Sequence, residues 1–483
     1  MKILFVTSEL SPLASTGGLG DVAGSLPQAL RQLGHDVRVI MPLYKTIKES
    51  YASELHFLRW SIIRLGWRTM YSGLFSMEVQ GVPVYLIDND FYFGHESLYI
   101  DYSFDIERFS FFQRAVLEAM GQPMAFEPDI LHLNDWQTGM IPVLLESHYQ
   151  SCGFHRQVRS LMTLHNLKHQ GIHGRERVQD LLDLPDDTMT ESKVLMKGEP
   201  NFLKAGIVFS SRVTTVSPTY SREIMTDYFG EGLDDLLASQ SWKLSGILNG
   251  IDTELYNPES DPEIASSFSA KSWVRGKGAC KKALQDELNL PREAKVPLLA
   301  MVTRLDSQKG LDLLLHILDE LLEEDLQFVV LGTGDPSYEK KLQDAQEAHP
   351  DRMRAIIRYD RHLSRRIYAG ADLFVMPSLF EPCGLSQMIA MRYGTLPIVR
   401  QTGGLADTVE AYNKYEKTGS GFGFLNINAH ELLYTAKEAI EVYREDKDTW
   451  NHMVKTAMSG DYSWTRSAKD YEALYQSILE ESR

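Results

Sequence analysis

The stretch from Leu4 to Gly34, "LFVTSELSPLASTGGLGDVAGSLPQALRQLG", decides the fold of the first half of the chain. It begins with a short apolar run that is typical of a buried strand, and helical periodicity follows from Asp21 to Leu33. Gly34 then marks the C-terminal end of the helix. A strand that leads through glycines into a helix is the first unit of a doubly wound α/β domain.

The glycines of this stretch have the spacing of a nucleotide-binding turn, but their surroundings do not fit a dinucleotide site. Such a site needs its first glycine directly after the strand and an acid after the second strand. Here "SELSPLAST" separates the strand from Gly17, and the second strand ends in "PLYK" at residues 42–45. We therefore disfavour a nicotinamide-dependent dehydrogenase.

Thr16, Gly17 and Gly18 still place bare backbone N–H groups at the start of a helix. Such groups suit a phosphate or sugar oxygen, because the helix dipole is positive at that end. A plain glycine-rich connection is the alternative interpretation.

Further apolar, β-branched runs alternate with helical patterns along both halves of the chain, and the alternation restarts after the Asn249-Gly250 turn. The pattern predicts two Rossmann-like, doubly wound parallel-sheet domains that face each other across a cleft, where loops from the strand ends bind ligands. We expect an N-terminal domain at residues 1–245, a C-terminal domain at 246–458 and a final helix within 459–483 that packs back on the N-terminal domain.

Composition narrows the class of protein. A formal charge of −17 argues against nucleic acid as a partner, because phosphate backbones are held by clustered Lys and Arg. The three cysteines, Cys152, Cys280 and Cys383, suggest neither disulfides nor a metal site, so we expect a cytoplasmic protein. Near the N-terminus, no signal-peptide pattern or membrane span is apparent.

Two cations stand in a loop of the second half, between a strand and a helix. In "MVTRLDSQKGLDLLL", Arg304 offers a planar fork and Lys309 a point charge, and together they suit a diphosphate. The alternative is that both cations are simply solvated.

The run "FEPCGLSQM" follows another strand of the second half and opens a helix. Glu381 stands just ahead of this helix, and the backbone at Gly384, Leu385 and Ser386 can bind an anion there. A carboxylate beside a phosphate site suits the binding of sugar hydroxyls and the stabilisation of an oxocarbenium-like charge. The alternative is that Glu381 caps the helix.

In the first half, Asp135 and His165 each come directly after a predicted strand, so both are candidates for holding a sugar hydroxyl. A single histidine is more often structural. Their spacing is not that of metal ligands, and we predict no metal and no cofactor.

These motifs, with "NDWQTG", "LHNLKHQG", "GILNGID" and a second "TGGLAD" at 402–407, resemble those of bacterial glycogen synthases and plant starch synthases along essentially the whole chain. That family consists of retaining glycosyltransferases of family 5 with the GT-B fold. The resemblance implies transfer of glucose from a nucleotide sugar, usually ADP-glucose, to the nonreducing end of an α-1,4-glucan. It implies that no metal takes part in the transfer. It does not indicate an oligomeric state.

The resemblance also implies roles for single residues. Arg304 and Lys309 match the pair that holds the donor phosphates, and Glu381 matches the carboxylate that faces the transferred glucose. Cys383 to Ser386 match a loop that closes on the donor, and Tyr359 matches an aromatic residue that stacks on the nucleobase. The residues that match polar groups around the sugar are Asp21, Asp135, His165 and Asn249.

Two places depart from the family: "FYFGHESLY" lacks an arginine that the family often has after the aromatic pair, and the first glycine turn lacks a lysine. The family has Lys-x-Gly-Gly-Leu at the first glycine turn, and Ser15 takes the place of that lysine here. The loss of a charge-assisted contact with the donor costs roughly 1.5–3 kcal/mol, a tenfold to hundredfold effect on affinity. Two alternatives therefore stay open: a transferase with another donor, such as UDP-glucose, and a glucan-binding protein with weakened catalysis.

Overall fold

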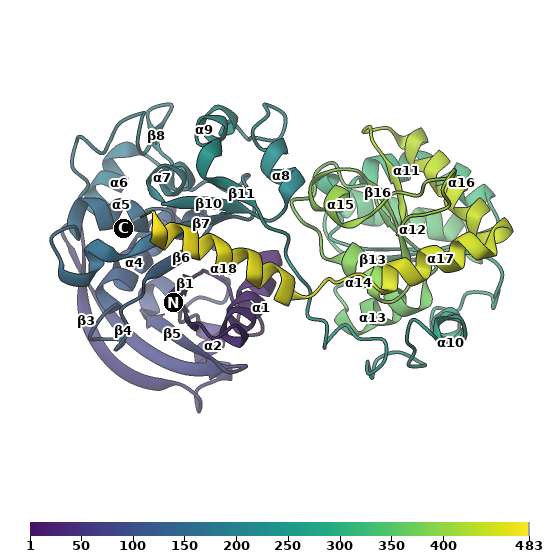
Figure 1. Cartoon of the computed structure of the whole chain (residues 1–483), viewed down its shortest axis with the longest axis horizontal. Coiled ribbons are helices and arrows are strands. Elements are labelled where there is room, and N and C mark those ends of the chain that lie inside the picture. Colours follow the sequence, from purple (N-terminus) through teal and green to yellow (C-terminus); the bar gives the residue numbers. More distant parts are fainter. Residues whose placement is uncertain (482–483) are drawn as a thin grey trace. The chain divides into compact units, whose positions relative to one another are not determined.

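The computed structural model describes residues 1–481, and the chain divides into two compact units (Figure 1). Unit 1 comprises Met1–Asn249 and the C-terminal segment that begins at Trp464, and unit 2 comprises Gly250–Ser463. The first division lies four residues beyond the position expected from the sequence, because the strand that ends at Gly246 still pairs within unit 1.

Unit 1 is built on a nine-stranded sheet with the order β11-β10-β7-β6-β1-β2-β5-β4-β3. Its strands are β1 (Lys2–Val6), β2 (Asp36–Pro42), β3 (His56–Leu65), β4 (Arg68–Val79), β5 (Val82–Asp88), β6 (Ile130–Asn134), β7 (Arg159–Leu164), β10 (Arg212–Thr215) and β11 (Leu244–Gly246). Seven strands run parallel, as predicted, whereas β4 pairs antiparallel with β3 and β5. The sequence interpretation missed this hairpin because β3 is largely exposed and lacks an apolar run.

Helices connect the parallel strands of unit 1. They are α1 (Gly18–Gln32), α2 (Lys45–Ser50), α3 (Asp90–Phe93), α4 (Tyr102–Ala119), α5 (Ile141–His148), α6 (Arg175–Leu182), α7 (Phe202–Phe209), α8 (Pro218–Glu223), α9 (Asp234–Ser239) and the C-terminal α18 (Trp464–Glu480). A two-stranded ribbon joins β8 (Leu195–Met196) to β9 (Glu199–Pro200).

The C-terminal helix α18 packs on unit 1 beside α1, as predicted (Figure 1). Tyr475 on α18 is fully buried, and its hydroxyl lies 2.7 Å from Nδ1 of the equally buried His132 on β6. Burial lowers the pKa of His132 well below its usual value, so this imidazole is neutral. In a partly buried contact, Nε2 of His35 lies 2.8 Å from Oε1 of Glu472 on α18.

Unit 2 contains a six-stranded, wholly parallel sheet with the order β14-β13-β12-β15-β16-β17. The strands are β12 (Leu298–Val302), β13 (Gln327–Gly332), β14 (Met353–Ile357), β15 (Leu373–Met376), β16 (Leu396–Arg400) and β17 (Phe422–Phe424). The helices are α10 (Trp273–Glu287), α11 (Leu311–Glu323), α12 (Pro336–Ala348), α13 (Arg361–Gly370), α14 (Ser386–Arg392), α15 (Gly403–Thr408), α16 (Ala429–Glu445) and α17 (Lys447–Met458). Both units therefore have the Rossmann-like architecture that the alternating pattern predicts.

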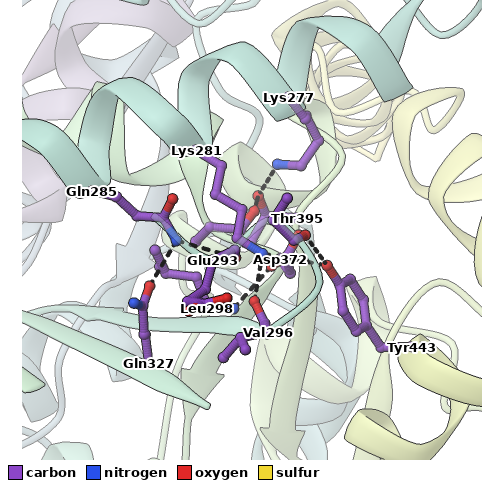
Figure 2. A network of polar contacts seen from close by, with 12 residues as sticks. Lys277, Lys281, Gln285, Glu293, Val296, Leu298, Gln327, Asp372, Thr395 and Tyr443 are labelled. Atoms are coloured by element: carbon purple, nitrogen blue, oxygen red, sulfur yellow. Dashed lines mark hydrogen bonds and ion pairs between the residues drawn. The ribbon is translucent and has the colours of Figure 1, made fainter. Parts of the chain in front are cut away.

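Two buried lysines of α10 bind this helix to the rest of unit 2 (Figure 2). Lys281 donates to the Asp372 carboxylate at 2.6 Å and to the Val296 carbonyl at 2.6 Å. No carboxylate of residues 1–481 lies within hydrogen-bond distance of the Lys277 ammonium. This ammonium donates instead to the carbonyls of Ala369 and Tyr393, both at 3.1 Å, and to the Thr395 hydroxyl at 2.7 Å.

The strand order also places the candidate site residues. In unit 1, the neighbouring strands β1, β6 and β7 end before the glycine turn, Asp135 and His165, respectively. In unit 2, the neighbouring strands β12 and β15 end before the loops of Lys309 and Glu381. Parallel strands end at the same edge of a sheet. The sheet of each unit therefore brings the loops of its own candidate residues together.

Candidate active site

A pocket with a cavity volume of about 70 Å³ lies in unit 2 at the carboxyl ends of β12 and β15. Its polar lining includes Thr303, Lys309, Ser378 and Glu381. The remaining lining residues are Met301, Val302, Val375, Met376, Gly384, Leu385 and Ser386. Five residues predicted from the sequence thus border one cavity: Lys309, Glu381, Gly384, Leu385 and Ser386.

Lys309 and Glu381 form an ion pair in this pocket. The Lys309 Nζ atom lies 2.6 Å from Oε2 of Glu381, and the two side chains are only 16% and 8% exposed. The Ser378 hydroxyl donates to the same carboxylate oxygen at 3.2 Å. In such a poorly hydrated place, the charges of an ion pair act strongly on a bound ligand.

The local sequence explains how Lys309 reaches the pocket. The Asp306 side chain caps the short 3-10 helix Ser307–Lys309, and Gly310 ends it with a positive φ of 72°. A Cβ atom at Gly310 would lie 2.0 Å from the Pro377 carbonyl oxygen, so only glycine fits between the two loops. The Leu379 amide then donates to the Gln308 carbonyl at 2.8 Å.

Two buried side chains hold the loop that carries Glu381. Arg400, at the end of β16, donates to the carbonyls of Ser378, at 2.9 Å, and Leu379. Gln387, on α14, donates to the carbonyls of Cys383 at 3.1 Å and Gly384 at 3.0 Å. Arg400 thus binds the backbone before Glu381, and Gln387 binds the backbone after it. The sequence interpretation named neither Arg400 nor Gln387.

Glu381 does not cap the helix that follows it. The N-cap of α14 is Leu385, which makes no side-chain capping bond, and the Glu381 carboxylate contacts Lys309 and Ser378 instead. The helix-capping alternative is therefore wrong. Gly384 adopts a positive φ of 71°, which favours glycine.

Three predicted residues of unit 2 lie outside the pocket lining. Arg304 follows β12, and its side chain is 69% exposed and lies 3.4 Å from Asp306. The Tyr359 ring is 84% exposed in the loop before α13. Cys383 is buried below the loop, and its backbone lies against Gly404.

In unit 1, a buried carboxylate organises the loop before the glycine turn. Glu9 is 4% exposed and accepts hydrogen bonds from the Thr16 amide and the Thr16 hydroxyl, both at 2.7 Å. The Tyr99 hydroxyl donates to the same carboxylate at 2.7 Å. The sequence interpretation missed Glu9, although it also comes shortly after a strand, the signal that singled out Asp135 and His165.

The two Thr-Gly-Gly-Leu segments differ in their packing. A Cβ atom at Gly17 or Gly18 would meet no atom within 4 Å, so the packing of unit 1 does not require glycine there. A Cβ atom at Gly403 would lie 2.0 Å from the Glu381 carbonyl oxygen, and one at Gly404 would lie 2.1 Å from that of Cys383. The first pair thus leaves bare backbone open to a ligand, and the second pair supports the Glu381 loop.

Ser15 and Asp21 flank the open glycines. The Ser15 hydroxyl donates to the Gly17 carbonyl at 3.2 Å, and its side chain lies over Gly20. Asp21 is exposed in the first turn of α1, where a carboxylate stabilises the helix end.

Asp135 and His165 lie together at the ends of β6 and β7. The His165 amide donates to Oδ1 of Asp135 at 2.8 Å, and Asp135 adopts a positive φ of 53°. Burial raises the pKa of Asp135 to about 7, with a smaller contribution from Glu9, although backbone N–H groups oppose the shift.

Burial lowers the pKa of His165 to about 3, so its imidazole is neutral. Its Nε2 atom lies 2.9 Å from Oδ1 of Asn134, whose amide nitrogen donates to the Val6 carbonyl at 3.0 Å. Because the Asn134 oxygen must accept, Nε2 of His165 carries the proton and Nδ1 is left as an acceptor.

Asn249 is the last residue before the chain passes into unit 2. The side chain is 7% exposed, and its Oδ1 atom is buried without a hydrogen-bond partner among residues 1–481. A polar atom in this state is ready to bind a donor group from a ligand.

Within residues 1–481, no three His, Cys, Asp or Glu side chains are grouped so that they could hold a metal ion. No helix in the same range has both the length and the apolarity that crossing a bilayer requires.

Comparisons with known proteins agree with this geometry. The family described as "Starch synthase catalytic domain" matches residues 2–239, and the family "Glycosyl transferases group 1" matches residues 285–450. The chain is 47% identical to the glycogen synthase of Anoxybacillus flavithermus over 479 residues, which cover 99% of this chain and 98% of the relative. The glycogen synthase of Lachnospira eligens is also 47% identical, with coverage of 99% and 100%.

Solved structures match the whole chain as well. The catalytic domain of starch synthase IV from Arabidopsis thaliana, bound to ADP and acarbose, has a TM-score of 0.91 and 35% identity, with 99% of each chain covered. A sucrose-phosphate synthase from Thermosynechococcus elongatus has a TM-score of 0.61 at 17% identity and shares the fold alone.

Two Rossmann-like units of these families define a glycosyltransferase of the GT-B class. Within that class, the chain belongs to the family of glycogen and starch synthases.

Proposed function

We propose that this enzyme transfers glucose from ADP-glucose to the nonreducing end of an α-1,4-glucan, with retention of configuration. The observation that carries the proposal is the Lys309–Glu381 pair in the pocket of unit 2. The relatives named glycogen synthase support a glucan acceptor, and the starch synthase structure bound to ADP supports an adenine nucleotide in the donor.

In unit 2, Lys309 and Arg304 hold the donor diphosphate and neutralise its charge as it leaves. Glu381 stabilises the positive charge that develops on the glucose ring, because its carboxylate is held in a fixed place with little water. The acceptor 4-hydroxyl enters from the face that the diphosphate leaves, and its proton passes to the departing phosphate. Cys383 to Ser386 border the glucose, and Tyr359 stacks on the base.

In unit 1, the bare backbone at Gly17 and Gly18 binds a phosphate or sugar oxygen, and Asp21, Asp135, Asn249 and His165 bind sugar hydroxyls. Nδ1 of His165 accepts a hydroxyl proton, because Nε2 is committed to Asn134. Ser15 lies where the family has a lysine, and its hydroxyl replaces that charge with a neutral donor. We further propose a cytoplasmic location, which suits the three free cysteines.

The test is the incorporation of labelled glucose into glycogen from ADP-glucose and from UDP-glucose. We expect ADP-glucose to be used and Glu381→Ala to abolish transfer. We expect Ser15→Lys to lower the KM for the donor about tenfold to hundredfold, because it restores a charge-assisted contact. A wild type that is inert with both donors but binds glycogen would favour the binding protein, and a preference for UDP-glucose would favour the other transferase.

A further inference from the structure

Exposed hydrophobic side chains gather on strands β3 and β4, at one margin of the unit 1 sheet (Figure 1). Of the seventeen large hydrophobic residues that are exposed within 1–481, six lie between positions 57 and 71. They are Phe57, Leu58, Trp60, Ile62, Trp67 and Tyr71. Exposed patches of this kind mark interaction sites.

A β-bulge turns the aromatic residues of β3 to one side. Phe57 pairs with Phe75, but the next pair is Arg59 with Leu74, so β3 has one extra residue at Leu58. Residues three apart normally point to opposite faces of a strand, whereas this extra residue brings Phe57 and Trp60 to the same face. We call the surface formed by Phe57, Trp60, Ile62, Tyr71 and Phe75 the aromatic face.

Gly73 provides the space in which the Tyr71 ring lies. On the sheet, Gly73 pairs with Trp60 on one side and with Asp88 of β5 on the other. A Cβ atom at Gly73 would lie 2.6 Å from the Tyr71 hydroxyl oxygen and 3.1 Å from the Asp88 Cβ. The Tyr71 phenol therefore extends over the glycine, in the row that runs from Trp60 to Asp88.

Polar groups border the aromatic face next to Tyr71. Lys48 donates to Oδ1 of Asp88 at 3.1 Å and to Oδ1 of Asp90 at 2.9 Å, and the Asp90 side chain is 78% exposed. Lys48 is one cation beside two carboxylates, so this border has no excess of positive charge that would attract an anionic ligand. Aromatic rings with such a border suit a pyranose, because its C–H face stacks on a ring while its hydroxyls reach carboxylate and ammonium groups.

We propose that the aromatic face binds a chain of the glucan acceptor, at a site separate from the residues that carry the transfer. This inference rests on the proposed function. The connection that follows β5 links the two places: Asn89 donates to the Tyr71 carbonyl at 2.7 Å, and Tyr99 in the same connection contacts Glu9, which holds Thr16.

A second copy of this chain is the rival occupant, because β3 is an edge strand. The exposed charges of Lys48 and Asp90 beside the rings speak against it, since the centres of protein interfaces are depleted of charged residues. A neutral polymer of hydroxyl groups fits both the rings and the border.

The test compares wild type, the double variant Trp60→Ala/Tyr71→Ala, and Gly73→Ala, which displaces the Tyr71 ring but removes no aromatic residue. Trp242→Ala is the matched control, since Trp242 is a 68% exposed tryptophan elsewhere in unit 1. Retardation in native gels that contain glycogen measures affinity. Transfer rates with glycogen and with maltotriose, at saturating ADP-glucose, separate a polymer site from the active site, and melting curves check folding.

We expect the double variant to lose about tenfold in glycogen affinity and Gly73→Ala to lose less, with maltotriose kinetics and Trp242→Ala unchanged. Equal affinity in all variants would overturn the proposal, as would a wild-type dimer that becomes monomeric in the double variant. If wild type transfers no glucose from any donor, the proposed function fails. Selective loss of retardation by the aromatic-face variants would then still place glucan on this face.

Discussion

Asp135 is a buried carboxylate with a pKa raised to about 7, well above the value near 3.8 of an unfolded chain. A raised carboxyl pKa adds stability at acid pH, and this stability is lost as the pH rises toward 7. Between pH 5 and 7 Asp135 contributes a slope of up to about −1.4 kcal/mol per pH unit to the unfolding free energy of unit 1, whereas the buried neutral His132 and His165 contribute slopes of the opposite sign. Urea unfolding across this range measures the slope.

Asp135→Asn should remove the Asp135 contribution, so that the slope of wild type is more negative than that of the variant by up to about 1.4 kcal/mol per pH unit, because asparagine keeps the shape, tolerates the positive φ and does not titrate. The exposed Asp187→Asn serves as the control and should leave the slope unchanged. Equal slopes in wild type and Asp135→Asn would contradict the raised pKa of Asp135.

At the scale of elements, Gln387 links α14 to the loop of Glu381. Gln387→Glu keeps the size of the side chain but loses the N–H groups that hold the carbonyls of Cys383 and Gly384. We expect kcat to fall about hundredfold with a smaller change in the donor KM, because a displaced carboxylate stabilises charge poorly. Steady-state kinetics measure both parameters.

Gln285→Glu is the matched control for that experiment. Gln285 is also a buried glutamine of unit 2, and it donates to Gln327 at 2.8 Å in the network of Figure 2. This change should lower stability and leave kcat nearly unaltered. Equal losses of kcat in the two variants would show that Gln387 acts through folding alone.

Lys277 joins α10 to the ends of α13 and α14 (Figure 2). In Lys277→Met, up to three buried acceptors lose their donor, at about 1–3 kcal/mol each, although the burial of a charge is also relieved. We expect unit 2 to lose about 3 kcal/mol of stability. Urea unfolding of the variant checks this value, and an unchanged midpoint would contradict it.

The sequence predicts elements whose signal is local. Apolar runs mark the parallel strands, and Gly34 marks the end of α1. The sequence also selects the loops of Lys309 and Glu381, but their ion pair joins residues 72 positions apart and depends on the neighbouring positions of β12 and β15. Gln387 and Arg400 were missed for the same reason, since their partners are backbone carbonyls that no side-chain pattern reveals.

At the scale of the whole molecule, α18 completes unit 1. Tyr475→Phe removes the hydroxyl that contacts His132 and leaves a buried ring nitrogen without that partner. We expect unit 1 to lose about 1–3 kcal/mol of stability, while unit 2 is unaffected. Thermal unfolding followed by hydrogen exchange in each unit measures the difference, and equal loss of protection in both units would contradict it.

The way the chain passes between its units has a practical consequence. Unit 2 begins at Gly250 and ends at Ser463, and these ends adjoin, because the Ile251 amide donates to the Tyr462 carbonyl at 2.8 Å. On the unit 1 side, the Ser467 hydroxyl contacts the Leu248 carbonyl. Unit 2 is thus inserted as one continuous segment between the two segments of unit 1. A short linker from Asn249 to Trp464 in place of unit 2 would leave both segments of unit 1 intact.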